Sequence, residues 1–286
     1  MARRTANGAR MNSIATDYQQ GTGSPWPCLR AIAEAGFTHV HWCHHWNTDF
    51  LYSAPEISQI LRWLGELGLS VTDIHASAGQ EKAWASELEY ERLAGVELVV
   101  NRLEMAARLG CDVAVLHIPA EPEEPAARLA YWERLRRSLD ALMGCSRTTG
   151  VRIALENGGT PESWVPIVRV LSEYGPEFAG LCYDAGHGNI SGDGLDRLEA
   201  HSDRLLSVHL HDNDGSGDQH LLPFMGTVQW GRLAGLIAGS SYEKWVNLEV
   251  SQARSGYDDG RAFLRDALAA AGRLAEAIAT AGADHD

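Results

Sequence analysis

Six short apolar runs in this chain each reach a residue that can bind a metal ion or transfer a proton. A buried parallel strand that ends in a polar side chain, repeated along the chain, is how a (β/α)8 barrel builds a site on one rim. The repeated pattern therefore limits both the fold and the location of the site. The runs are DIHAS, AVLHIP, RIALENGG, GLCYDAGH, SVHLHDND and VNLEVS, and the residues are His75, His117, Glu156, Asp184, His209 and Glu249.

Strand-like and helix-like segments alternate through the whole sequence. The expected strands are short and mostly apolar, as for strands buried on both faces, and amphipathic stretches separate them. Eight strands, each followed by a helix, predict a single α/β domain, a (β/α)8 TIM barrel with its active site at the C-terminal rim. A doubly wound open sheet is the competing architecture, but it would gather its ligands at one switch point. The strands are expected at 12–16, 38–42, 70–75, 112–117, 151–156, 179–184, 205–210 and 245–250.

Length and composition agree with one catalytic domain. The chain has 286 residues and is 45% hydrophobic, and barrels of roughly 250 residues form one domain. We expect residues 1–10 to be a disordered extension and residues 11–280 to form the barrel. The five cysteines include no CxxC pair, which favours a reduced, cytoplasmic protein. No apolar run approaches the roughly 18 residues of a membrane span.

The strand ends supply a coherent set of metal ligands. Glu156, Asp184, His209 and Glu249 end four consecutive expected strands, so they should converge on one space. Imidazole and carboxylate donors are typical of zinc, manganese, cobalt and iron sites. The pattern therefore predicts an enzyme that depends on a divalent metal, with one cation in the main hypothesis and up to three in the alternative.

Three motifs carry a resemblance to a known family. They are ALEN, the DAGH box at 184–187 and HLHDNDGSGDQHLLPFMGTVQW at 209–230. With them the chain resembles the xylose isomerase-like TIM barrel superfamily, which holds sugar phosphate isomerases and epimerases and the apurinic endonuclease family 2. The resemblance implies a sugar or keto-polyol isomerase or epimerase that transfers a proton through a metal-stabilised enediolate. It implies Glu156, Asp184, His209 and Glu249 as ligands of Mn2+, Co2+ or Zn2+, and Glu156 and Glu249 as the catalytic acid–base pair.

The choice of histidine ligand stays open at this point. His209 and His211 have the same strand parity, so both can point into the barrel. Each is followed three residues later by an acid, Asp212 or Asp214. We prefer His209, because HLHD matches the family's HLND pattern at the strand end, which leaves His211 as a substrate or supporting group.

A second member of the superfamily implies a different reaction. Endonuclease IV uses nine ligands for three zinc ions, and this chain has a like residue at each matching place. The alternative is therefore a di- or trinuclear zinc hydrolase of a phosphoester or similar bond. In the isomerase hypothesis, His75 and His117 bind substrate hydroxyls and Asp218 and His220 order a loop. The nine positions are His75, His117, Glu156, Asp184, His187, His209, Asp218, His220 and Glu249.

The charge of the expected rim opposes a nucleic-acid substrate. The net charge is −14, and the segments after the strands carry few cations apart from Lys82 and Arg254. A phosphodiester backbone needs cationic contacts. Gly215 also stands where ketose epimerases have an arginine. We therefore expect a small, neutral polyhydroxy substrate that contacts Trp46 and Arg254, no membrane partner, and a homo-oligomer as an open option. The acids expected at the mouth are Glu121, Glu123, Glu124, Asp212, Asp214 and Asp218.

Overall fold

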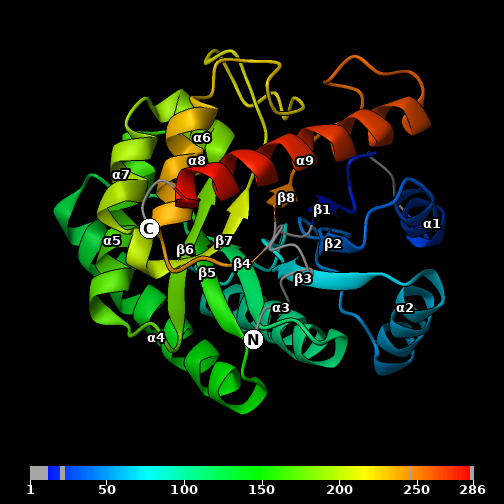
Figure 1. Ribbon diagram of the computed structural model, residues 1–286. Helices are drawn as coiled ribbons and strands as arrows, with labels where there is room; N and C mark the ends of the chain where they lie inside the picture. The colour runs from blue at the N-terminus through cyan, green and yellow to red at the C-terminus, as the bar shows by residue number, and fades with distance from the viewer. Residues whose placement is uncertain (1–11, 20–22, 245, 284–286) are drawn as a thin grey trace.

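Eight parallel strands form a nearly closed barrel, as the sequence predicts (Figure 1). The computed structural model describes residues 12–19, 23–244 and 246–283. Each strand lies within two residues of its expected position at either end. The strands are β1 (Asn12–Ala15), β2 (His39–Trp42), β3 (Ser70–His75), β4 (Val113–His117), β5 (Arg152–Glu156), β6 (Ala179–Asp184), β7 (Leu205–His209) and β8 (Val246–Leu248).

The sheet closes between its last two strands. The pairing order is β7-β6-β5-β4-β3-β2-β1-β8, so β8 pairs with β1. An isolated parallel bridge joins Leu210 to Leu248. Around it, the Leu210 amide donates to Asn247 at 2.9 Å and the Glu249 amide donates to Leu210 at 3.3 Å. Closure brings the end of β8 beside the ends of β7 and β1.

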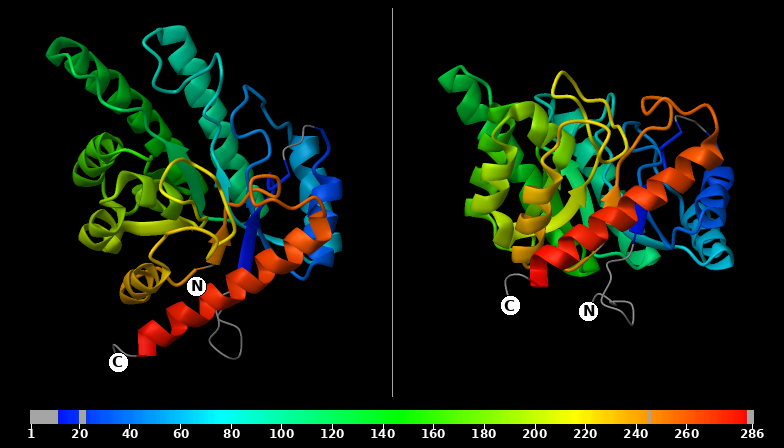
Figure 2. Two further views of the ribbon diagram at one scale, coloured as in Figure 1. Left: turned by 90° about the horizontal axis from the view of Figure 1, so that it is seen from above. Right: turned by 45° about the horizontal axis from the view of Figure 1, so that its top comes forward.

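Helices surround the strands, as the view from above shows (Figure 2). Among the described residues, short helices α6 and α7 both lie between β6 and β7. The α-helices are α1 (Trp26–Glu34), α2 (Ala54–Leu67), α3 (Glu89–Leu109), α4 (Pro125–Thr149), α5 (Trp164–Glu173), α6 (Ala185–Ser191), α7 (Gly194–Ala200), α8 (Trp230–Gly239) and α9 (Gly260–Ala283), with 3-10 turns η1 (Pro161–Ser163) and η2 (Ser202–Arg204).

Local sequence signals explain where several helices begin and end. Ser53 caps α2, and a capping box joins its side chain and backbone to Glu56. Gly68, Gly110 and Gly150 end α2, α3 and α4 in the left-handed conformation, at φ of 66°, 82° and 75°. Glycine adopts that conformation without steric cost, so these helices end where the sequence predicts.

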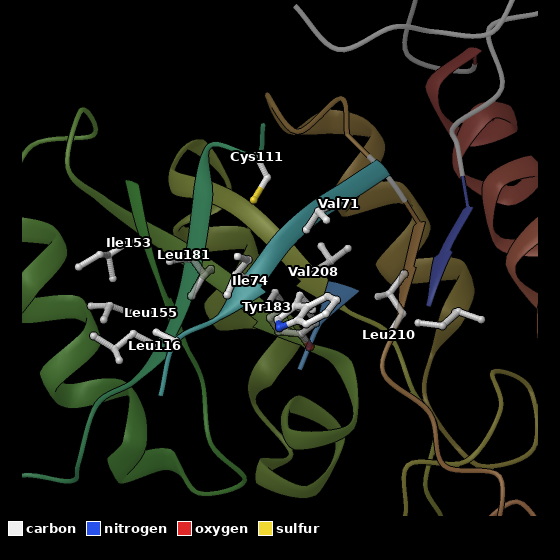
Figure 3. Close-up of a cluster of buried hydrophobic side chains, with 14 of the residues drawn as sticks. Val71, Ile74, Cys111, Leu116, Ile153, Leu155, Leu181, Tyr183, Val208 and Leu210 are labelled. Carbon is white, nitrogen blue, oxygen red and sulfur yellow. The ribbon is translucent and has the colours of Figure 1, made fainter. Parts of the chain in front are cut away.

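Alternate strand residues build two separate layers. Outward-facing side chains such as Leu155, Leu181 and Tyr183 pack in the main core between the strands and the helices (Figure 3). Residues of the opposite parity form a small cluster of their own. Burying one leucine or isoleucine in such a core stabilises the fold by about 1.5–3 kcal/mol. The small cluster consists of Val113, Val115, Ala154, Cys182 and Leu206. The first four share the strand parity of the polar residues that end their strands, and Leu206 lies at the register shift between β6 and β7.

The described residues cover most of the barrel domain expected at 11–280 but not the extension before it. The extension expected at 1–10 lies outside the described residues, so it stays a prediction. The last helix continues to Ala283. No helix in the described part of the chain is both long enough and apolar enough to cross a membrane.

Candidate active site

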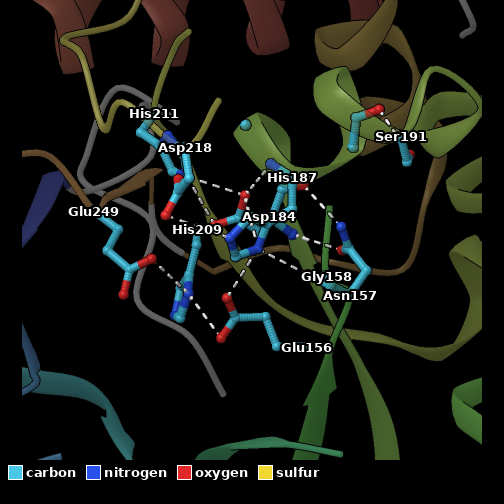
Figure 4. A network of polar contacts seen from close by, with 12 residues as sticks. Glu156, Asn157, Gly158, Asp184, His187, Ser191, His209, His211, Asp218 and Glu249 are labelled. Carbon is cyan, nitrogen blue, oxygen red and sulfur yellow. Dashed lines mark hydrogen bonds and ion pairs between the residues drawn. The ribbon is translucent and has the colours of Figure 1, made fainter. Parts of the chain in front are cut away.

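The polar strand ends converge at one end of the barrel, as predicted from the sequence (Figure 4). Glu156, Asp184 and His209 are the last residues of β5, β6 and β7, and Glu249 directly follows β8. A cavity of about 760 Å³ opens beside Glu249, with His220 and Arg254 also in its wall. The barrel topology thus gathers the predicted ligands at one rim, and Glu249 connects them to a space large enough for a small substrate.

His209 lies between the two glutamates. Its Nδ1 is 3.3 Å from the Oε2 of Glu156 and 3.2 Å from the Oε2 of Glu249. His209 is fully buried and Glu156 is 3% exposed. Neither ring nitrogen of His209, nor the Oε2 of Glu156, makes a hydrogen bond of acceptable geometry. Buried polar atoms without partners are rare, so this cluster has the donors that a cation would complete.

Asp184 lies in a second group with two histidines. Its carboxylate is 3.0 Å from the Nε2 of His211 and accepts the backbone amide of His187 at 2.6 Å as the cap of α6. The Nδ1 of His187 lies 3.5 Å from Asp184 and 3.6 Å from Glu156. His187 therefore links the Asp184 group to Glu156, and through Glu156 to His209.

The remaining predicted positions also lie at the site. The Nε2 atoms of His75 and His117 are each 3.5 Å from the Oε2 of Glu156. On the other side, Asp218 lies 3.0 Å from the Nε2 of His220 and 3.7 Å from the Nε2 of His211. Two groups of potential metal ligands result. Glu156 connects one group to His209, and His211 connects the other to Asp184. The two groups are His75, His117 and Glu156, and His211, Asp218 and His220.

The buried charges shift one another's pKa values. Burial alone would raise the pKa of Glu156, but His117 and His209 hold it well below its usual range. Burial alone would lower the pKa of His209, yet Cys182, Glu249 and Glu156 raise it well above its ordinary value. Burial and the nearby Glu249 together raise the pKa of Asp17. For Glu156 and His209 the neighbouring charges thus act against burial, because several ionisable groups lie close together in the site.

Comparison with known proteins identifies the family. A family model described as a xylose isomerase-like TIM barrel matches residues 29–267, which is most of the chain. The chain belongs to the xylose isomerase-like TIM barrel family. An uncharacterized protein, y4fM of Sinorhizobium fredii, is 34% identical over 278 residues, which cover 88% of this chain and 89% of that protein.

Several solved structures share the fold of this chain. A D-tagatose 3-epimerase-like protein superposes with a TM-score of 0.76 and 20% identity, covering 96% of this chain and all of that one. L-ribulose 3-epimerase gives a TM-score of 0.73 and 16% identity, covering 97% of both chains. The 3-keto-D-glucoside 4-epimerase of E. coli gives a TM-score of 0.69 and 20% identity, covering 91% of this chain and 98% of that one. At these identities the likeness establishes the fold.

Trp46 and Arg254, the two residues expected to contact the substrate, both line the cavity. The ring centroid of Trp46 is 4.6 Å from that of His75 and 5.7 Å from that of His117. Arg254 donates to the backbone oxygen of Asp218 at 2.6 Å. Among the described residues that line this cavity, Arg254 is the only arginine or lysine.

The expectation that Asp212 lies at the mouth is wrong. Asp212 is fully buried. Its carboxylate accepts the amides of Phe224 and Val228 at 2.9 and 3.0 Å and the indole N–H of Trp230 at 2.9 Å. The long β7–α8 connection folds back on itself, so Asp212 holds this loop in place and adds no charge to the rim.

Sequence reasoning missed four polar residues of the barrel interior. They lie on or just after β1, β2 and β3, where His75 was the only metal ligand considered. The signal was present, because His41 and Cys43 alternate on and just after β2 as His209 and His211 do on and after β7. The four are Asp17, His41, Cys43 and Asp73.

Proposed function

We propose that this protein is a divalent-metal-dependent isomerase or epimerase that acts on a sugar or keto-polyol by proton transfer through an enediolate. The observation that carries the proposal is the approach of Glu156 and Glu249 to the same nitrogen of His209, at 3.3 and 3.2 Å. Sugar epimerases among the structural neighbours support it, since their names include D-tagatose, L-ribulose and D-psicose 3-epimerases.

Four residues would hold one cation: Glu156, Asp184, His209 and Glu249. The fit is supported by the unpartnered buried nitrogens of His209 and Oε2 of Glu156. Three carboxylates and one imidazole suit Mn2+, Co2+ or Zn2+. Such a cation supplies Lewis acidity, which polarises a substrate carbonyl and acidifies the neighbouring C–H.

The chain's own residues would carry the proton. One of Glu156 and Glu249 removes it from the carbon next to the carbonyl, and the other, or the same one, returns it to the opposite face or to the adjacent carbon. His187 and His220, which are partly exposed at the site, would donate hydrogen bonds to the oxygen that gains charge. Trp46 and Arg254 would contact the bound substrate.

The cavity wall favours a small neutral substrate. Its aromatic and polar lining carries a single guanidinium, Arg254, whose Nη1 already donates to Asp218. A nucleic-acid backbone needs several cationic contacts, and arginine or lysine side chains commonly hold a phosphate group. We therefore propose an unphosphorylated polyhydroxy compound as the substrate, without a nucleic-acid or membrane partner. We also propose the cytoplasm as the place of action. Homo-oligomer formation stays a prediction.

Proton exchange with solvent tests this proposal without knowledge of the final product. The purified chain, loaded in turn with Mn2+, Co2+ and Zn2+, is incubated in D2O with a panel of unphosphorylated ketoses and keto-polyols. We expect deuterium to enter the carbon next to the carbonyl of at least one compound, as read by NMR, and the Glu249→Gln variant to abolish it. Absence of exchange across the panel with every metal would contradict the proposal.

One observation favours a second candidate, a di- or trinuclear zinc hydrolase of a phosphoester or similar bond. The two flanking groups, His75 with His117 and Asp218 with His220, each share contacts with the central residues. The reaction catalysed, taken together with elemental mass spectrometry of protein purified without added metal, separates the candidates. Two or three zinc ions per chain together with cleavage of a phosphoester would support the hydrolase, and exchange at a ketose carbon would support the isomerase.

A further inference from the structure

We propose that His41, Cys43 and Glu249 bind a second divalent cation, of the zinc class, on the β1–β2–β8 side of the barrel. His41 lies on β2, and Cys43 and Glu249 directly follow β2 and β8. One donor atom from each of the three lies within 4.8 Å of the others. The proposal shares Glu249 with the proposed catalytic site but does not depend on the proposed reaction.

The hydrogen bonding of His41 has the form expected of a metal ligand. Its Nδ1 bonds to the Oδ1 of Asp73 at 2.7 Å, which assigns the Nδ1 proton to this bond. Its Nε2 makes no hydrogen bond, although the side chain is fully buried. That free nitrogen faces the Oε1 of Glu249 at 3.9 Å. Metal-binding histidines nearly always donate their other N–H to a carboxylate or carbonyl, so a cation would complete this arrangement.

Asp73 is itself held firmly beneath His41. The side chains of Thr72 and Ser207 donate to its carboxylate, Thr72 at 2.7 Å. Asp73 is 4% exposed. These contacts fix the Asp73 carboxylate, and its bond to the Nδ1 of His41 keeps the free Nε2 of that ring pointed at Glu249.

Cys43 supplies the softer donor. Its side chain is 1% exposed and lies in the cavity wall beside Glu249. The Glu249 carboxylate beside it would attract a cation, and zinc binding would release the thiol proton as a thiolate–zinc bond forms.

The geometry suits a site with one open position. Donors around a tetrahedral zinc with bonds of about 2.0–2.3 Å lie about 3.5 Å apart, close to the observed 3.9 Å between His41 and Glu249. Three protein donors leave a fourth position, and Cys43 and Glu249 both line the cavity. The Oε1 of Glu249 faces His41 and its Oε2 faces His209, so this carboxylate can bridge the two proposed cations.

Cobalt spectroscopy tests the site directly. The reduced, metal-free full chain is titrated with Co2+ as the probe. We expect a thiolate-to-cobalt charge-transfer band in the near ultraviolet, which oxygen and nitrogen ligands do not produce. Cys43→Ser should lose this band and one equivalent of bound Co2+, with its circular dichroism unchanged. Asp73→Asn should weaken the binding that produces the band by about 10- to 100-fold, because Asp73 orients the ligand.

Two controls make the outcome specific. Cys182→Ser removes another buried thiol, one that lies near Glu156 and His209, and should keep the band. Asp184→Asn impairs only the proposed catalytic site and should also keep the band. A wild-type chain saturated with Co2+ but lacking the band, or a Cys43→Ser variant that retains it, would overturn the proposal. Loss of catalysis in Asp184→Asn with the band intact would separate the two sites.

Discussion

Glu249 approaches His209 through its Oε2, which lies 3.2 Å from the ring Nδ1. The two residues come from the ends of β8 and β7, the strands between which the barrel closes. Glu156 approaches the same nitrogen from β5 at 3.3 Å. Closure of the barrel thus brings two carboxylates from separate strands to one imidazole, the arrangement on which the proposed acid–base pair rests.

Replacement of Glu249 by glutamine should abolish turnover while the fold survives. An amide cannot accept the substrate proton, and general acid–base catalysis contributes about 10²- to 10⁴-fold to the rate. Deuterium exchange into a ketose measures the loss, and circular dichroism checks the fold. Glu66→Gln, an exposed change on α2, is the matched control. Normal activity in Glu249→Gln would remove Glu249 from the acid–base role.

Removal of the metal should inactivate the protein reversibly. EDTA should abolish exchange, and Mn2+, Co2+ or Zn2+ should restore it. A ligand that binds only the folded state stabilises it by about 2.7 kcal/mol at 100 times its Kd, so the melting temperature should rise with added metal. Full activity of protein shown by elemental analysis to be metal-free would refute the metal dependence.

Substitutions can distinguish the roles of His209 and His211. His209 contacts both glutamates, whereas His211 contacts Asp184. We expect His209→Asn to lower the affinity for the catalytic metal by at least about 10-fold. We expect His211→Asn to bind this metal as the wild type does but to impair turnover. Isothermal titration with Mn2+ compares the variants. The reverse result would assign the ligand role to His211.

A methyl group at Gly186 should disturb the site without removing any titratable group. A Cβ on Gly186 would collide with the ring of His211, which contacts Asp184. Gly186→Ala should therefore displace the ring and lower turnover. The control is Gly144→Ala in α4, where a Cβ meets no atom within 4 Å and alanine should stabilise the helix by about 0.5–1 kcal/mol. Equal activity of the two variants would show that the ring has room to move.

An ion pair far from the site should make stability depend on pH. Hydrogen bonds from Arg136 lower the pKa of Glu173 to about 2 from the ordinary 4.5, although burial acts in the opposite direction. Two contacts of 2.8 Å join these side chains. A lowered folded-state pKa stabilises the fold above pH 4.5, and this contribution is lost as the pH falls from 4.5 toward 2.

The Glu173→Gln variant measures that contribution. Because the pair is partly exposed, we expect a loss of about 1 kcal/mol at pH 7, or about 2 °C in melting temperature. The difference from wild type should shrink below pH 4.5, where the wild-type carboxylate gains its proton. A difference that stays constant down to pH 3 would show that packing, not charge, accounts for it.

Much of this protein could be predicted from local pattern. Strand periodicity and helix-ending glycines such as Gly110 depend on neighbouring residues, so they predict the eight strands and where the helices stop. The same parity puts Glu156 and Asp184 at strand ends on the inside of the barrel. The rule that parallel strands share one polar rim then predicts that these residues meet.

Only the tertiary structure decided which inward side chains meet across the barrel. His41 lies 3.9 Å from Glu249 and bonds to Asp73, and those partners are distant in sequence. Asp212, expected at the mouth, was instead buried by the folding of its own loop. The sequence determined strand order, parity and the residue types at the rim, because these depend on local periodicity. The stagger of the closed barrel and the loop conformations decided the pairings, because they bring together atoms that no local pattern relates.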